Sequence, residues 1–241
     1  GKVVVEISSS GLAPVPRQLD AVRNGVVDIA VSANGFTRAQ AILPMIAEIP
    51  LNSKVGSARA HSLALWRTYE KFFAAKNEFR GVKVLGFFAM SPNHLFNGKR
   101  AIKNFDDVRG LKIRTNPDGV AYVSAMGAVV VSRPAPETFE IISSGVADGT
   151  IMPSWGIIGF NVVEKQPYGL YIPGGFSRST FALVMNQGKW DSLSPDVQKA
   201  ILAVSGEKYA DIAGGMMDQF ETEATAELRK RGVAIADGTD E

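Results

Sequence analysis

The feature that most constrains this chain is a spacing pattern that occurs twice. From Pro16, apolar residues follow at +3 and +6, glycine at +9, valine at +10 and aspartate at +12, and the same spacing starts from Pro136. An apolar run precedes each copy, Val3–Ile7 in the first and Ala128–Val131 in the second. Proline in a first helical turn, one apolar stripe and a closing glycine predict a strand, a helix and a further strand. Two such units predict two similar lobes, each with a parallel sheet covered by helices.

Other segments fit the same α/β plan. Residues 57–79 predict a helix whose one face carries Leu65, Tyr69, Phe72 and Phe73. Strands are predicted over 82–90, 111–115 and 180–186. A turn capped by Asn104 should end at Gly110, and a helix should run from Asn116 to Gly127. Residues 194–231 predict helix throughout, bent at Ser205-Gly206 or at Gly214-Gly215. A helix of that length is expected to lie across both lobes.

Composition excludes several classes of site. The 241 residues carry a formal net charge of +2 and no cysteine, which removes disulfides, thiolate metal sites and cysteine nucleophiles. Only two histidines, His61 and His94, are present, and no HExxH, Walker or GxGxxG motif occurs. The longest apolar runs are far shorter than the roughly 20 residues of a membrane span. We therefore expect no catalytic set, no metal, no cofactor and no nucleic-acid partner.

Arg114 is the strongest candidate for a binding residue. It stands at the end of a predicted strand and is followed by Thr115 and by Asn116, the expected cap of the next helix. Ligands of open α/β sheets bind beyond the carboxyl ends of strands, where helix N-termini favour anions. A guanidinium there can hold a carboxylate through two parallel hydrogen bonds. An ion pair with a neighbouring Asp or Glu would explain the same position, and position alone does not separate the two.

The segment Gly98–Thr115, which ends in Gly-Leu-Lys-Ile-Arg-Thr, resembles the signature of the DctP-type solute receptors of tripartite ATP-independent periplasmic (TRAP) transporters. In that family the arginine of this strand binds the ligand carboxylate. Four more segments resemble the family in the expected order, namely Leu19–Ala30, Ile49–Leu51, Glu137–Gly149 and Phe181–Leu193.

The resemblance implies a periplasmic binding protein type II-like fold, with two Rossmann-like lobes, crossing strands as hinges and a long C-terminal helix spanning both. Lobe I would comprise 1–91 and 180–218, and lobe II would comprise 92–179 and 219–241. About one strand and one helix expected before Gly1 are absent, as is some chain after Glu241. We therefore expect Gly1 to be a start inside a longer protein.

The chain also departs from the family pattern. His94 occupies about the place where several members carry a second ligand arginine, which puts a two-arginine clamp in doubt. Met152 and Pro153 replace residues that make polar or metal-bound ligand contacts in some relatives. With Trp155, Phe36 and Phe176 as further candidates for the pocket wall, these changes favour an apolar organic acid.

The resemblance implies a non-enzymatic receptor that binds a small organic carboxylate in the bacterial periplasm and delivers it to the membrane subunits of a TRAP transporter. The expected ligand-binding residues are Arg114, Asn116, His94, Met152, Trp155, Phe36 and Phe176. We expect a monomer without cofactor or metal. Two alternatives are an enzyme on a similar scaffold, which would need a nucleophile or acid/base pair in the cleft, and the effector-binding domain of a transcription regulator.

Overall fold

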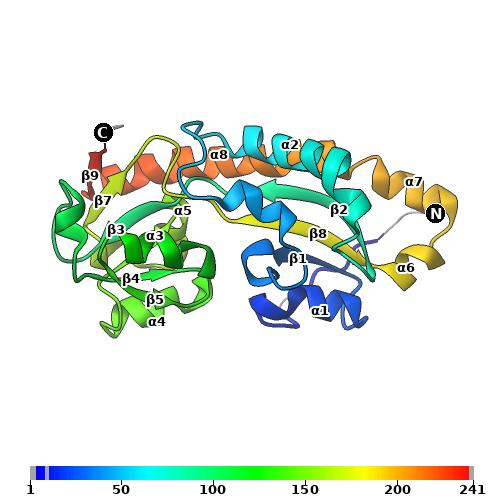
Figure 1. The fold of residues 1–241 in the computed structure, drawn as a ribbon, viewed down its shortest axis with the longest axis horizontal. Coiled ribbons are helices and arrows are strands. Elements are labelled where there is room, and N and C mark those ends of the chain that lie inside the picture. Colours follow the sequence, from blue (N-terminus) through cyan, green and yellow to red (C-terminus); the bar gives the residue numbers. More distant parts are fainter. Residues whose placement is uncertain (1–3, 9–10, 239–241) are drawn as a thin grey trace.

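The computed structural model describes residues 4–8 and 11–238. Two sheets lie side by side, and one long helix runs over both (Figure 1). One sheet has the order β1-β8-β2, and the other has the order β5-β4-β6-β3-β7-β9. Their bounds are β1 (Ile29–Ala33), β2 (Val82–Ala89), β3 (His94–Asn97), β4 (Lys112–Thr115), β5 (Val129–Ser132), β6 (Gly149–Met152), β7 (Tyr168–Tyr171), β8 (Thr180–Asn186) and β9 (Ala234–Asp237).

The sheets define two α/β lobes, called lobe I for the three-stranded sheet and lobe II for the six-stranded one. The strands of each sheet fall within the residues predicted for that lobe, and the boundaries themselves remain a prediction. In lobe I, β8 pairs antiparallel with both neighbours. In lobe II, β4 is parallel to β5 and β6, β3 is antiparallel to β6 and β7, and β9 is parallel to β7.

Both copies of the repeat form the predicted helix and the strand after it. In the first, η1 (Val15–Arg17) and α1 (Gln18–Arg23) lead through Gly25 to β1. In the second, η8 (Ala135–Glu137) and α4 (Thr138–Ser143) lead through Gly145 to β6. Both glycines have a positive φ, 72° and 74°, which a glycine adopts without strain at a helix end.

The strand predicted from the apolar run at residues 3–7 is wrong for its described part. Residues 4–8 have no regular secondary structure, and residues 2 and 3 lie outside the described residues. Val4 and Ile7 are 79% and 91% exposed, because no described strand pairs with this segment. The parallel sheet predicted for lobe I is also wrong for the described strands, because β8 returns from lobe II between β1 and β2 and runs antiparallel to them.

The predicted helix 57–79 is shorter and less regular than expected. It comprises α2 (Ala58–Thr68), the π-helix η4 (Tyr69–Phe73) and η5 (Ala74–Lys76), and ends at Asn77 in a left-handed conformation. A π turn adds one residue to the turn and shifts the face that follows. Phe72, predicted on the apolar face, is therefore 56% exposed, whereas Leu65 and Tyr69 pack in the core.

After α6 (Gln187–Ser192), the helical region predicted over residues 194–231 consists of α7 (Pro195–Leu202) and α8 (Gly206–Lys230). It breaks at Ser205-Gly206, one of the two predicted positions, and continues without a break through Gly214. A Cβ on Gly214 would lie 2.6 Å from Ser62 Oγ, so glycine allows α8 to pack closely on α2. No helix in the described part of the chain combines the length and apolar character that crossing a membrane needs.

One turn of α8 joins the lobes. Asp218 accepts hydrogen bonds from Ser57 Oγ (2.7 Å) and from the backbone N–H of Arg59 (3.2 Å), at the start of α2 in lobe I. Three residues later, Glu221 accepts from the backbone N–H of Ser154 at 3.0 and 3.1 Å, at the start of α5 (Ser154–Gly159) in lobe II. Each carboxylate therefore holds the N-terminus of a helix in a different lobe.

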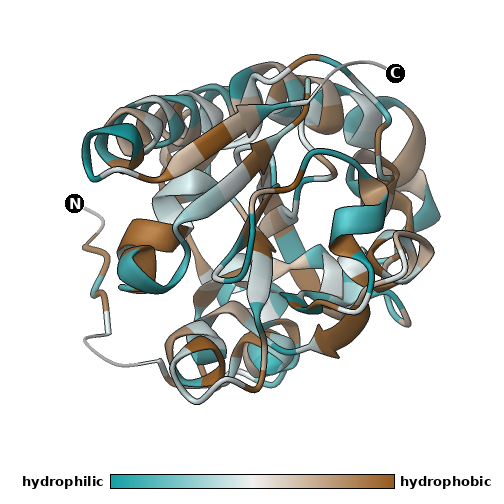
Figure 2. Cartoon of the chain, turned by 90° about the vertical axis from the view of Figure 1, so that its left-hand side faces the viewer, coloured by the Kyte–Doolittle hydropathy of each residue, from teal (hydrophilic) through white to brown (hydrophobic). Residues whose placement is uncertain are grey.

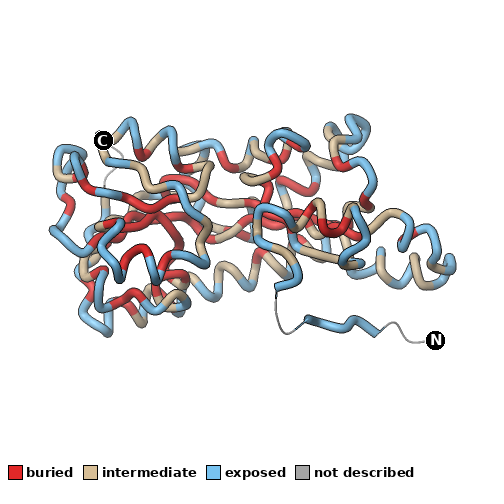
Figure 3. Tube along the Cα trace, turned by 90° about the horizontal axis from the view of Figure 1, so that it is seen from below, coloured by how far each residue is buried: buried red, intermediate tan, exposed pale blue. Residues whose placement is uncertain are grey.

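Each lobe has its own core, and the buried segments follow the two sheets (Figure 3). Viewed from the lobe II end, hydrophobic and hydrophilic stretches alternate along the helices (Figure 2), as amphipathic helices covering a sheet require. The remaining elements are short, namely η2 (Asn34–Phe36), η3 (Leu43–Glu48), η6 (Phe105–Val108), η7 (Pro117–Gly119), α3 (Val120–Ala125) and η9 (Val163–Lys165). The predicted Asn104 cap and the helix from Asn116 that closes at Gly127 are confirmed.

Candidate functional site

A cavity of about 220 Å³ lies between the lobes, at the carboxyl ends of β4 and β6. Five of the seven predicted ligand-binding residues line it, namely Phe36, Arg114, Asn116, Met152 and Trp155. Lobe I contributes the turn after β1 and the start of β8, and lobe II contributes the segments after β4 and β6. An occupant of the cavity would therefore touch both lobes.

Arg114 is fully buried, with 0% exposure, at the wall of this cavity. Its Nε and Nη2 donate to the carbonyl oxygen of Arg133 at 3.0 and 2.7 Å, and Nη2 also donates to Asn116 Oδ1. None of the hydrogen bonds between described residues uses Nη1. Burial lowers the pKa of Arg114 to about 10, so the guanidinium stays charged at neutral pH. The neighbours fix the orientation of the guanidinium, and its positive charge lies at the cavity wall, where an anion can be attracted.

Asn116 has a different role from the helix cap predicted for it. It occupies the N-cap position of η7, but its side chain makes no capping hydrogen bond. Instead, its Oδ1 accepts from Arg114 and its Nδ2 lies 3.4 Å from Ser179 Oγ, in the segment that leads into β8. Asn116 therefore positions Arg114 and connects lobe II to the segment that crosses between the lobes.

The rest of the cavity wall is largely apolar. Met152 ends β6 and is 3% exposed, and Trp155 follows in the first turn of α5. Phe36 lies opposite in lobe I, and two aromatic residues that the sequence did not single out, Phe160 and Phe181, complete the wall. The indole Nε1 of Trp155 is buried without a hydrogen-bond partner among the described residues.

His94 does not line this cavity. Its ring stacks on Tyr171, with centroids 3.9 Å apart and planes 3° apart, and its Nε2 lies 3.8 Å from Glu221 Oε1. Burial lowers the pKa of His94 to about 3, so the ring is neutral at physiological pH. His94 therefore does not supply a second positive charge to the site.

Arg178 is a second buried arginine, which the sequence analysis did not single out. It donates to the carbonyl oxygens of Val55 and Gly174 at 2.9 and 3.1 Å and does not line the cavity.

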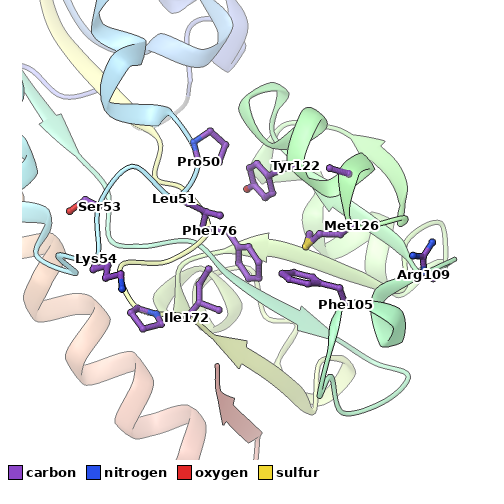
Figure 4. Close-up of a pocket in the computed structure, with 12 residues that line it drawn as sticks. Pro50, Leu51, Ser53, Lys54, Phe105, Arg109, Tyr122, Met126, Ile172 and Phe176 are labelled. Atoms are coloured by element: carbon purple, nitrogen blue, oxygen red, sulfur yellow. The ribbon is translucent and has the colours of Figure 1, made fainter. Parts of the chain in front are cut away.

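Phe176 also lies outside this cavity. It stacks on Tyr122 and lines a second, larger groove of about 540 Å³ (Figure 4). This groove lies between α3 on one side and the loop after η3 on the other. The charged side chains of this groove, Lys54 and Arg109, are exposed, and Arg109 pairs with Asp106 at 2.7 Å. The cavity at Arg114 is the better candidate site because its charge is buried and held in place.

Two buried acidic residues that the sequence analysis did not single out lie near the cavity, Asp118 beside Arg114 and Glu48 beside Asp118. Asp118 lines the cavity from η7, and Glu48, at the end of η3, is 3% exposed. Burial raises the pKa of both carboxyl groups, to about 8 for Glu48. An acidic residue in the first turn of a helix is common, so Asp118 carried no distinct sequence signal. The described residues contain no group of three or more His, Asp or Glu side chains placed to hold a metal ion.

The chain is similar to known solute-binding proteins over nearly its whole length. The family model for bacterial extracellular solute-binding protein, family 7 (DctP), matches residues 1–241. A relative from Comamonas testosteroni, named outer membrane transporter protein TsaT, is 35% identical over 238 residues, which cover 97% of this chain and 69% of the relative. The 2,3-diketo-L-gulonate-binding periplasmic protein YiaO of Escherichia coli is 25% identical over 96% of this chain and 70% of its own length.

Two solved structures are similar over most of their length. A TRAP periplasmic solute-binding protein from Bordetella bronchiseptica with bound (R)- and (S)-mandelate has a TM-score of 0.90 and 29% identity, covering 97% of this chain and 74% of that one. A TRAP solute-binding protein from Rhodoferax ferrireducens with copurified benzoate has a TM-score of 0.85 and 26% identity, covering 94% and 70%.

Proposed function

The chain belongs to the bacterial extracellular solute-binding proteins of family 7, and from this premise we propose that it captures an aromatic or otherwise apolar monocarboxylate between its lobes. It is a receptor for small organic acids rather than an enzyme. We further propose that it works in the bacterial periplasm, as a monomer, and delivers the acid to the membrane permease of a TRAP transporter.

The observation that carries this proposal is the buried guanidinium of Arg114 in an otherwise apolar cavity. Among the described residues that line the cavity, Arg114 is the only cation and Asp118 the only acidic residue. A second ligand carboxylate would lack a cationic partner and would face Asp118, which is costly in a buried site. A volume of about 220 Å³ is smaller than that of the pockets of roughly 300–1,000 Å³ that hold drug-sized ligands, and suits a small acid.

The similar structures support the same ligand class. One holds mandelate and another benzoate, each a single carboxylate on an aromatic ring. We propose that Arg114 and Asn116 hold the carboxylate end and that Phe36, Met152 and Trp155 contact the apolar end. We also propose the lobe boundaries 1–91 with 180–218 and 92–179 with 219–241, with the segments that cross near residues 91 and 179 as hinges.

Thermal-shift measurements test the ligand class directly. Benzoate and mandelate should raise the melting temperature more than succinate or malate, because only the aromatic acids match one buried cation and an apolar wall. Benzyl alcohol, which keeps the ring without the carboxylate, is the control and should have little effect. Native mass spectrometry of the purified protein would identify any acid it carries. Greater stabilisation by succinate or malate would contradict the proposal.

A further inference from the structure

Glu48 and Asp118 approach one point from different lobes. Glu48 ends η3 in lobe I, and Asp118 lies in η7 in lobe II. Gly35, in the turn after β1, separates them. A Cβ placed on Gly35 would lie 3.3 Å from Glu48 Oε2 and 3.9 Å from Asp118 Oδ1. The two carboxyl groups therefore lie on either side of Gly35, and both line a hollow next to the cavity that contains Arg114.

The hydrogen bonds of Glu48 are satisfied on one oxygen only. Its Oε1 accepts from the backbone N–H of Thr180 at 2.8 Å and from the hydroxyl of Thr180 at 2.7 Å. Its Oε2 is buried and has no hydrogen-bond partner among the described residues. Asp118 interacts with the Ser179 side chain and with its own backbone N–H. A proton on Glu48 Oε2 would turn the unpartnered acceptor into a donor that faces Asp118.

The surrounding charges do not neutralise both carboxyl groups. Arg38 attracts each of them, and Arg114 attracts Asp118, but burial raises both pKa values by more than these cations lower them. Asp118 raises the pKa of Glu48 further and also that of Tyr122, which stays protonated at neutral pH. Two buried carboxylates that face the same glycine repel each other when both are ionised, which favours a proton on one of them.

We propose that Glu48 and Asp118 form a binding site for one proton that is complete only when the lobes are closed, so that ligand capture takes up a proton. When the lobes separate, water reaches both carboxyl groups and each ionises near its ordinary pKa. Closure brings them together and removes the water, and the pair then shares one proton. The coupling of this proton to the ligand depends on the proposed function, because the ligand drives closure.

The direction of the pH dependence follows from the raised pKa of Glu48. Between its ordinary value of 4.5 and about 8, the closed state holds a proton that the open state has lost. Raising the pH through this window therefore disfavours closure. The dissociation constant should increase by up to about tenfold for each pH unit in this window.

Titration calorimetry at pH 6.5, with benzoate and mandelate in buffers of different ionisation enthalpy, counts the protons taken up on binding. The wild type should take up close to one proton, and Glu48→Gln close to none. Glutamine keeps an acceptor for Thr180 and offers Asp118 a permanent donor, so affinity should survive and lose its pH dependence. Glu223→Gln is the matched control, because it makes the same exchange at an exposed carboxylate of α8 outside the cavity, and it should leave the uptake unchanged.

Small-angle scattering of the ligand-free protein provides a measurement that needs no ligand. Lowering the pH from 8 to 5.5 should reduce the radius of gyration of the wild type more than that of Glu48→Gln. Binding without proton uptake in the wild type, or uptake that persists unchanged in Glu48→Gln, would overturn the proton site. Failure of the aromatic acids to bind would contradict the proposed ligand, and the scattering series would still decide the proton site.

Discussion

At the scale of single residues, Arg114 could be predicted, whereas the approach of Glu48 to Asp118 could not. A strand that ends in arginine and leads into an Asn-Pro helix start is a local pattern, and the structure places Arg114 in the cavity. Glu48 and Asp118 are far apart in the sequence and meet only because two lobes face each other. His94 and Phe176 were predicted to bind ligand from their positions along the chain. In the structure His94 stacks on Tyr171 and Phe176 stacks on Tyr122, both outside the cavity.

Arg114→Lys should weaken binding of the aromatic acid by about tenfold or more, a loss of at least about 1.4 kcal/mol. Lysine keeps the charge but cannot make the paired contacts to the Arg133 carbonyl and to Asn116 that orient the guanidinium. Calorimetry with benzoate or mandelate measures the change. Arg109→Lys, on the exposed face of lobe II, is the control and should bind as the wild type does. Equal affinity in the Arg114 variant would exclude the proposed role.

At the scale of elements, the sequence predicted where helices begin and end more accurately than it predicted the geometry of their interiors. Proline at a first turn and glycine at a last turn impose local backbone geometry, so both copies of the repeat were found from residue types alone. The π turn at Tyr69–Phe73 and the unpaired residues 4–8 depend on what packs beside them. A hydrophobic period cannot reveal those neighbours, and both segments were predicted wrongly.

Asp218→Ala should destabilise the protein by about 1–2 kcal/mol, because the start of α2 loses the carboxylate that accepts from Ser57 and Arg59. For a chain of this size the melting temperature should fall by about 4 °C. Differential scanning calorimetry makes the comparison. Glu223→Ala, which removes an exposed carboxylate one turn and a half further along α8, should change the melting temperature by less than about 1 °C. Equal shifts in the two variants would show that Asp218 has no special role.

At the scale of the whole molecule, the repeat predicted two lobes, and the long helical stretch predicted a connection between them. No local sequence pattern predicts how one lobe is oriented relative to the other, because this orientation depends on the crossing segments and on α8 together. That orientation decides which residues share the cavity, and for this reason Phe160 and Phe181 entered the site only with the structure.

Binding of an aromatic acid should reduce the radius of gyration of the wild type, because only the closed form lets Arg114 and Phe36 contact the ligand together. Arg114→Ala should lose this compaction along with its affinity. Phe36→Ala should retain weak binding to an open form, since the carboxylate contact on lobe II remains. Small-angle scattering with and without saturating ligand gives the answer. An unchanged radius of gyration in a wild type that binds the acid would rule out hinge closure.

The two carboxylates of α8 that hold different lobes sit only one helical turn apart, at Asp218 and Glu221. Any rotation between the lobes must therefore be absorbed over about 4.5 Å of a continuously hydrogen-bonded helix. A helix resists bending over so short a length, so we expect this turn of α8 to oppose rotation of one lobe against the other. We infer that α8 acts as a stiff connection, which limits how far the lobes separate and favours the same opening after each release of ligand.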